Sequence, residues 1–182
     1  MFFGIRLTKE WKEMLSSAQQ GLDGVRWTKQ ENLHLTLLFL GNIDQKISSE
    51  LCQNATPMLL RSFFIDGHGV SAFPALENPR VLFASVKLNA ELLALHQKLR
   101  DLCEALGIPL EARSYTPHIT LGRVRRKKLQ LQNWHDANES LVLPPFQVQT
   151  FELMEKEKHE RSHRYATRQV LPLNKGKDSL PV

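Results

Sequence analysis

The sequence YTPHITLGR, which covers residues 115–123, alternates polar and apolar side chains. Successive side chains of a β-strand point to opposite faces of a sheet, so His118 and Thr120 would share one face. Ile119 and Leu121 would share the other face. Burial of these two aliphatic side chains leaves an imidazole and a hydroxyl next to each other on the opposite face. Together with the arginine that ends the stretch, these groups are suited to contact a phosphate.

The same pattern occurs earlier in the chain, in the sequence NLHLTLLFL of residues 32–40. We expect a strand in which His34 and Thr36 share one face. The other face would carry the apolar residues Leu33, Leu35, Leu37 and Phe39. One chain of this composition in roughly a thousand would contain two such motifs by chance. Either motif alone is typical of a half-exposed strand, but the repetition indicates a shared function.

The composition is that of a globular protein. The chain has 182 residues, 42% of them hydrophobic and 24% charged, which predicts one domain or two closely joined lobes. The net charge of +5 weakly favours an anionic partner. Cys52 and Cys103 lie in apolar, helix-like stretches without metal-ligand spacing, so we expect both to be reduced. With no signal peptide and no apolar run of membrane-spanning length, the sequence predicts a cytoplasmic location.

The order of predicted elements indicates an α+β fold of two related halves, each with one His-x-Thr motif, and not a parallel sheet. Capping residues predict helices that begin after Thr8 and Asn89. The predicted strands cover residues 2–7, 25–27, 32–40, 63–73, 80–88, 118–124, 146–154 and 166–173, and the predicted helices cover residues 9–20, 48–60 and 90–106. We expect one domain over residues 1–174 and a flexible tail over residues 175–182.

Two histidines on facing strands can provide the general acid and the general base of a displacement at phosphorus. Thr36 and Thr120 could donate hydrogen bonds to the non-bridging phosphoryl oxygens. Arg123 could also bind a phosphate. By simple alternation, however, it lies on the strand face opposite His118, unless the strand bends at Gly122.

These residues resemble the 2H phosphoesterases, which are defined by two His-x-Thr/Ser-x motifs. Within them, the chain is similar to the bacterial RNA 2′,3′-cyclic phosphodiesterases, also called 2′–5′ RNA ligase-like proteins. The resemblance covers nearly the whole chain and rests on residues 2–5 (FFGI), 32–41 (NLHLTLLFLG), 79–83 (PRVLF) and 117–123 (PHITLGR). It implies a bilobal fold in which two antiparallel sheets, related by a pseudo-twofold axis, enclose a central cleft with helices packed outside.

The resemblance also implies an enzyme that hydrolyses RNA terminal 2′,3′-cyclic phosphates to 2′-phosphomonoesters without a metal or other cofactor. His34 would then be the proton donor and His118 the proton acceptor. Thr36, Thr120 and Arg123 would bind the substrate phosphate. Relatives often have a tryptophan at Phe83, which we expect to fill the core. We expect a monomer that binds an RNA end or a small cyclic nucleotide and does not bind membranes.

Two other functions are compatible with the same residues. One is a non-catalytic module that binds nucleotides or RNA ends, since binding a phosphate needs the same donors. The other is reversible 2′–5′ RNA ligation, which reverses this chemistry in the same site. The retention of both histidines favours catalysis over binding alone.

Three further features have simpler interpretations. The sequence HERSH of residues 159–163 matches the H-E-x-x-H zinc motif, but its strand-like flanks favour a charged hairpin loop. This loop, residues 155–163, also departs from the Ser- and Gly-containing loop of relatives. The basic run over residues 123–128 is either a solvated loop or a contact for the RNA backbone. The remaining isolated histidines, read as structural or surface residues, are His68, His96 and His135.

Overall fold

The structure, a computed structural model, describes all residues except 56–59, 113, 126–128, 160–161 and 175–182. The predicted tail therefore lies outside the described residues, as does part of the basic run. The α+β class is confirmed, because four α-helices accompany a large antiparallel sheet. In the described part of the chain, no helix is long and apolar enough to cross a membrane.

The elements follow the predicted order, with two differences. The strands are β1 (Phe2–Arg6), β2 (Val25–Trp27), β3 (His34–Phe39), β4 (Phe63–Phe73), β5 (Val81–Val86), β6 (His118–Val124), β7 (Val142–Val148), β8 (Thr150–His159) and β9 (Ser162–Pro172). The helices are α1 (Lys9–Ser17), α2 (Gln45–Ala55), α3 (Ala90–Ala105) and α4 (Gln132–Asn138), with a short 3₁₀ turn, η1 (Gln30–Asn32).

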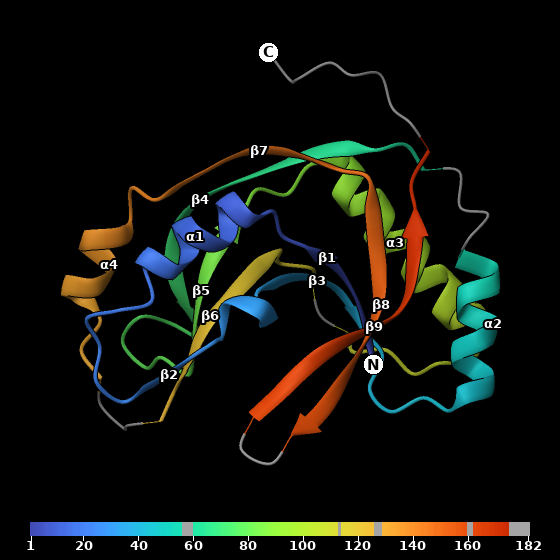
Figure 1. Cartoon of the computed structure of the whole chain (residues 1–182), viewed down its shortest axis with the longest axis horizontal. Coiled ribbons are helices and arrows are strands. Elements are labelled where there is room, and N and C mark those ends of the chain that lie inside the picture. The colour runs from blue at the N-terminus through green and yellow to red at the C-terminus, as the bar shows by residue number, and fades with distance from the viewer. Residues whose placement is uncertain (56–59, 113, 126–128, 160–161, 175–182) are drawn as a thin grey trace.

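The sheet consists of two four-stranded antiparallel halves in the order β7-β4-β5-β6 and β3-β1-β8-β9. They are joined at one residue pair, Leu35 with Ile119, between β3 and β6. β2 pairs with the far end of β6. The halves are not consecutive in sequence, since the C-terminal strands β8 and β9 lie beside β1 (Figure 1). Each half places one His-x-Thr motif on its inner strand.

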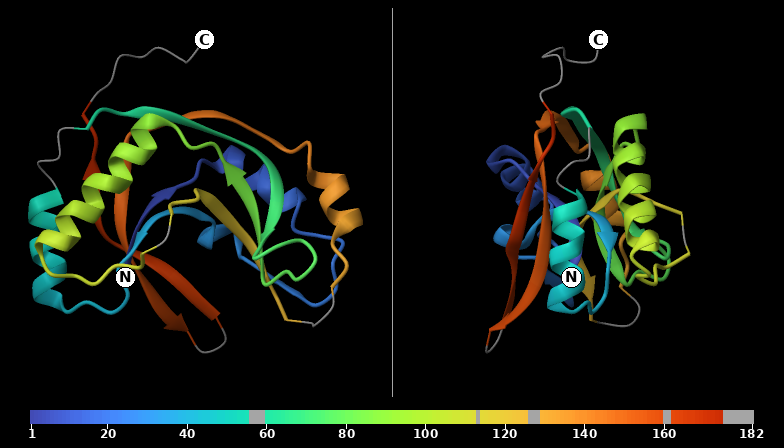
Figure 2. Two further views of the ribbon diagram at one scale, coloured as in Figure 1. Left: turned by 180° about the vertical axis from the view of Figure 1, so that it is seen from behind. Right: turned by 90° about the vertical axis from the view of Figure 1, so that its right-hand side faces the viewer.

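The helices lie in two groups at opposite ends of the sheet (Figures 1 and 2). α2 and α3 contact each other and pack on β9 and β3, while α1 and α4 pack on β7 and β4. The predicted caps are confirmed: Thr8 Oγ1 accepts from Trp11 N at 3.2 Å, and Asn89 Oδ1 accepts from Leu92 N at 2.8 Å. These bonds satisfy main-chain donors that have no partner within the helix.

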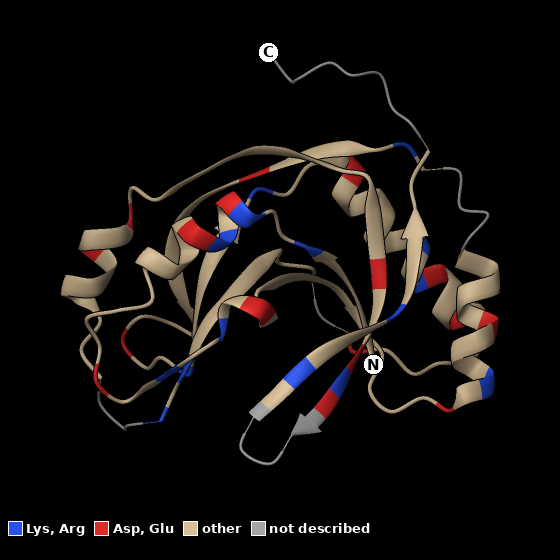
Figure 3. Ribbon diagram, viewed as in Figure 1, with Lys and Arg blue, Asp and Glu red and all other residues tan. Residues whose placement is uncertain are grey.

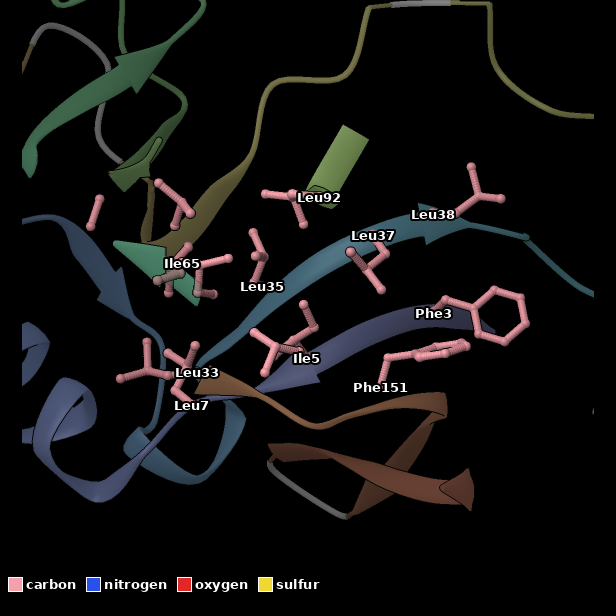
Figure 4. Close-up of a cluster of buried hydrophobic side chains, with 14 of the residues drawn as sticks. Phe3, Ile5, Leu7, Leu33, Leu35, Leu37, Leu38, Ile65, Leu92 and Phe151 are labelled. Carbon is pink, nitrogen blue, oxygen red and sulfur yellow. The ribbon is translucent and has the colours of Figure 1, made fainter. Parts of the chain in front are cut away.

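The core forms where the apolar faces of the inner strands meet the helices. Leu35 and Ile5 are paired across β3 and β1, and both are almost fully buried. Phe3, Phe151 and Leu92 of α3 lie in the same cluster (Figure 4). This burial removes apolar surface from water and leaves the opposite face of β3 with its polar side chains.

A β-bulge interrupts each motif strand at the same position. In β3, Gly4 pairs with Thr36 and Phe3 with Leu38, so Leu37 is an extra residue. The alternation therefore reverses after Leu37. Leu38 becomes buried and Phe39 is 62% exposed, so the prediction that Phe39 lies on the buried face is wrong. The sequence alone does not reveal a bulge, which shifts every later side chain to the other face.

The equivalent bulge in β6 falls at Leu121. Phe83 pairs with Thr120, and Leu82 pairs with Gly122. As the residue after this bulge, Gly122 is on the face opposite Thr120, which returns Arg123 to the face of Thr120. The two bulges thus occupy equivalent places in the two halves of the sheet.

The main-chain oxygens of both bulged residues accept hydrogen bonds from buried or partly buried side chains. His96 of α3 donates from Nδ1 to Leu37 O at 2.8 Å. Gln19 donates from Nε2 to Leu121 O, also at 2.8 Å. His96 is 7% exposed, which confirms a structural role for this histidine.

Two elements differ from the prediction. The segment that forms α4 was expected to be a loop. The helix is short and polar and has no side-chain cap, so the sequence gives little sign of it. The strand expected over residues 146–154 is two strands, β7 and β8, which belong to different halves of the sheet. The first part of β7 contains Pro144 and Pro145, which argue against a strand, yet prolines are tolerated at the sheet edge that β7 forms.

We expect His96→Ala to lower the free energy of unfolding by about 1–3 kcal/mol, because it leaves the buried Leu37 carbonyl without this donor. Urea unfolding followed by circular dichroism measures the change. His68→Ala, at an exposed position of β4, is the control and should change the free energy by less than about 0.5 kcal/mol. Equal stability of the two variants would contradict the role given to His96.

Candidate active site

The two motifs meet around the pair Leu35–Ile119. Both aliphatic side chains are fully buried, so the residues on either side of them point to the other face of the sheet. The antiparallel register around this pair places His34 near Thr120, and Thr36 near His118. The local twofold axis of the pair therefore relates the two motifs and brings two imidazoles and two hydroxyls onto one face.

Both imidazoles are oriented by the same kind of hydrogen bond. Nδ1 of His34 lies 2.6 Å from Asn32 O, and Nδ1 of His118 lies 2.7 Å from Thr116 O. A carbonyl oxygen only accepts, so each Nδ1 carries a proton and donates it. In the neutral ring Nε2 then has the lone pair. Nε2 of His34 is 3.1 Å from Thr36 Oγ1.

Burial lowers the pKa of His34 to about 4. The hydrogen bond to Asn32 opposes this shift, while the positive charges of Arg6 and His118 add to it. His34 is thus neutral at pH 7 in the free protein. The contribution of His118 also shows that the two histidines are close enough to interact.

Aromatic rings surround each histidine. The rings of Phe2 and Tyr165 each lie 4.8 Å from that of His34. The rings of Phe73 and Phe83 lie 4.9 Å and 5.4 Å from that of His118. Phe83 is buried, as expected, but it also packs against His118. These rings restrict the orientation of the imidazoles.

The structure brings all five predicted site residues to one face. His34, Thr36, His118 and Thr120 surround the central pair, and the bulge at Leu121 places Arg123 on the same face. Gly122 is essential to this arrangement, because a Cβ there would lie 2.7 Å from the side chain of Val25 and 2.8 Å from that of Trp27. The roles of the five residues in binding and catalysis stay predictions.

Sequence reasoning missed Asn32, which links His34 to the β8–β9 hairpin. Its carbonyl accepts the His34 hydrogen bond, and its side chain is 2% exposed. Nδ2 donates to His163 O at 2.9 Å, and Oδ1 accepts from Tyr165 N at 3.2 Å. A polar residue just before an apolar strand is a weak signal, since asparagine there usually indicates a turn.

The H-E-x-x-H sequence lies in the β8–β9 hairpin, since β8 ends at His159 and β9 begins at Ser162. Its two histidines therefore lie in paired strands and not on a helix where they would share a face, while Glu160 and Arg161 lie outside the described residues. Among the described residues, His135, Asp136 and Glu139 could together approach a metal, but these belong to the α4 region. Independence from metals stays a prediction.

Comparison with known proteins identifies relatives over most of the chain. A sequence profile of the 2′–5′ RNA ligase superfamily matches residues 8–160. The RNA 2′,3′-cyclic phosphodiesterase of Thermotoga maritima is 32% identical over 155 residues, which are 81% of this chain and 80% of that protein. The protein of the same name from Archaeoglobus fulgidus is 31% identical over 133 residues, 73% of this chain and 75% of that protein.

Solved structures share the fold. The TT0787 protein of Thermus thermophilus has a TM-score of 0.77 and 26% identity, with 96% of this chain and 97% of that chain covered. LigT of Escherichia coli in complex with 3′-AMP also has a TM-score of 0.77, at 23% identity, with 94% of this chain and 96% of that chain covered. The fold and the sequence comparison therefore agree.

We expect His34 to titrate near pH 4 and to carry its proton on Nδ1 at pH 7, because it is buried and donates to Asn32 O. Imidazole ¹⁵N chemical shifts measure both, with His34→Gln used to assign the signals. Since this pKa is below the ordinary value of about 6.5, the neutral ring stabilises the fold above pH 6.5. That stability should be lost as the pH falls towards 4, and His34→Gln should lack this loss. Titration of His34 near 6.5 would contradict the prediction.

Proposed function

The chain belongs to the 2′–5′ RNA ligase superfamily, and we propose from this that it is an RNA 2′,3′-cyclic phosphodiesterase that forms a 2′-phosphomonoester. The observation that carries the proposal is the position of His34 and His118 on one face of the sheet, on either side of the pair Leu35–Ile119. A displacement at phosphorus needs a base on the side of the nucleophile and an acid on the side of the leaving group. Two related imidazoles can supply both.

In the proposed reaction, His118 Nε2 takes a proton from a water molecule, and the water oxygen forms a bond to phosphorus. The bond between phosphorus and O3′ breaks, and His34 Nε2 gives its proton to O3′. The product carries the phosphate on O2′. At the end of the turnover His118 is protonated and His34 is neutral, so proton exchange with solvent restores the starting state.

The proposed phosphate contacts come from the same face. Thr36 and Thr120 have hydroxyl groups next to the imidazoles and can donate to the non-bridging oxygens. The Arg123 guanidinium can bind two such oxygens at once. Hydrogen bonds from these donors would stabilise the negative charge of the transition state.

The low pKa of His34 affects its proposed role as the acid. In the free protein the ring is neutral, because burial disfavours its charge. A bound cyclic phosphate brings a negative charge next to the ring and favours the imidazolium. We therefore infer that His34 takes up its proton together with the substrate.

The proposal includes a monomer that acts without a metal in the cytoplasm. In support, a single chain supplies both motifs, which meet within one sheet.

We expect His34→Gln and His118→Gln each to lower kcat by at least about 100-fold, because each removes one proton transfer. The substrate is an oligonucleotide that ends in a 2′,3′-cyclic phosphate, with EDTA present, and the product phosphate is identified by ³¹P NMR. Circular dichroism checks that each variant is folded. His68→Gln, which removes an exposed histidine of β4, should keep the wild-type rate.

Other outcomes would point to other functions. If the wild type binds the oligonucleotide but does not hydrolyse it at any pH from about 5 to 9, where histidine pairs titrate, a non-catalytic binding module replaces the enzyme. Loss of activity in EDTA would refute the metal-free reaction. A 3′-phosphate product would reverse the assignment of the leaving oxygen. Joining of RNA ends in place of hydrolysis would favour the ligase.

A further inference from the structure

We propose that Arg26 and His163 form a second anion site next to Arg123, and that this second site binds the phosphodiester group on the 5′ side of the terminal cyclic-phosphate nucleotide. The inference rests on the proposed function and makes it more specific. The preferred substrate is then an oligonucleotide, and a mononucleotide 2′,3′-cyclic phosphate is a poorer one.

Arg26 lies directly beside Arg123 on the face of the two histidines. The two arginines are paired across the antiparallel strands β2 and β6, so their side chains share a face. That face is also the face of Thr120, because of the bulge at Leu121. β5 occupies one edge of β6, so β2 and β3 share the other edge, and Arg26 lies on the same side of β6 as His34.

The β8–β9 hairpin completes the group from another part of the chain. Nη2 of Arg26 is 3.5 Å from Nδ1 of His163, whose main chain is held by Asn32. Lys156 is paired with Tyr165 in the hairpin, and Tyr165 contacts His34, so Lys156 is on this side as well. In Figure 3, blue segments of the hairpin and of the paired strands β2 and β6 lie in the lower half of the picture.

The acidic residues of the hairpin point the other way. Glu155 and Glu157 alternate with Lys156 along β8 and thus belong to the opposite face. There, both bind Arg168, at 2.6 Å and 3.1 Å. The hairpin therefore presents cations to the site and keeps its carboxylates away from it.

The cations of this group lack compensating charge. Within the described part of the chain, Arg26, Arg123 and Lys156 form no ion pair, whereas Arg6 next to His34 is paired with Glu152 at 3.0 Å. Burial lowers the pKa of His163. The nearby positive charges lower this pKa further, and they belong, in decreasing order of effect, to Lys156, Arg26, Arg123 and Lys29. A bound anion would relieve the mutual repulsion of these groups, which is strongest when they are partly removed from water.

The chemistry of the substrate determines which anion this is. A 2′,3′-cyclic phosphate is the 3′ end of its RNA, so every other phosphate of the strand lies on the 5′ side. With the cyclic phosphate between the histidines, the adjacent site can receive only the phosphate that links the last two nucleotides. Guanidinium groups suit such a diester, because they bind two of its oxygens together.

The test compares kcat/KM for four substrates: adenosine 2′,3′-cyclic phosphate, its 5′-phosphorylated form, the dinucleotide ApA with the cyclic phosphate, and the same dinucleotide with an uncharged methylphosphonate linkage. In the wild type, the two substrates with a charged 5′ group should exceed the other two by about tenfold or more, as expected for a charged hydrogen bond. In Arg26→Gln this ratio should approach one, and in Arg26→Lys it should be intermediate. Arg164→Gln removes the same charge from the residue after His163, on the other face of the hairpin, and should keep the ratio.

A wild-type ratio near one, or an unchanged ratio in Arg26→Gln, would refute the second anion site while leaving the proposed function in place. Hydrolysis of none of the four substrates would instead refute the proposed function. In that case, binding measurements still test the second anion site. By calorimetry, adenosine 2′,5′-bisphosphate should bind about tenfold tighter than adenosine 2′-phosphate, and Arg26→Gln should abolish the difference. Equal affinities in the wild type would refute the site.

Discussion

The contact on which the rest of the structure depends is the pairing of Leu35 with Ile119. It is the pair through which the two halves of the sheet are joined. Both side chains are excluded from water, and this fixes which face of each strand is apolar. The histidines and threonines next to them in sequence must therefore point to the opposite face of the sheet. One hydrophobic contact thus determines the register, the local symmetry and the composition of the site.

The arrangement of the site also requires the two β-bulges, at Leu37 and Leu121. Without the extra residue Leu121, Arg123 would point into the apolar side of β6, away from His118. His96 and Gln19 donate hydrogen bonds from outside the sheet to the main-chain oxygens of the two bulged residues, and Thr28 N also donates to Leu121 O. Some residues distant from the site in sequence therefore maintain the shape of the strands that form it. Phe39, the residue equivalent to Arg123 in the other half, is brought to the same face as His34 by the bulge at Leu37.

Much of the fold was predictable from helix capping and from the alternation of polar and apolar residues, which depend on neighbouring residues only. The strands of both motifs, the caps at Thr8 and Asn89 and the pairing of β4 with β5 follow from local patterns. The bulges do not, because an extra residue in one strand is defined only by its partner strand. Asn32 and Arg26 were missed for the same reason. Their importance lies in what the hairpin and β6 place beside them, and no local pattern records that.

Asn32 has a consequence for how this family can diverge. Its side chain holds the β8–β9 hairpin through His163 O and Tyr165 N, which are main-chain atoms. Nearly any residue provides such atoms, so the hairpin can exchange its side chains without losing its attachment beside His34. The orientation of His34 and the side chains of the hairpin can therefore change independently, because one asparagine holds both through main-chain atoms.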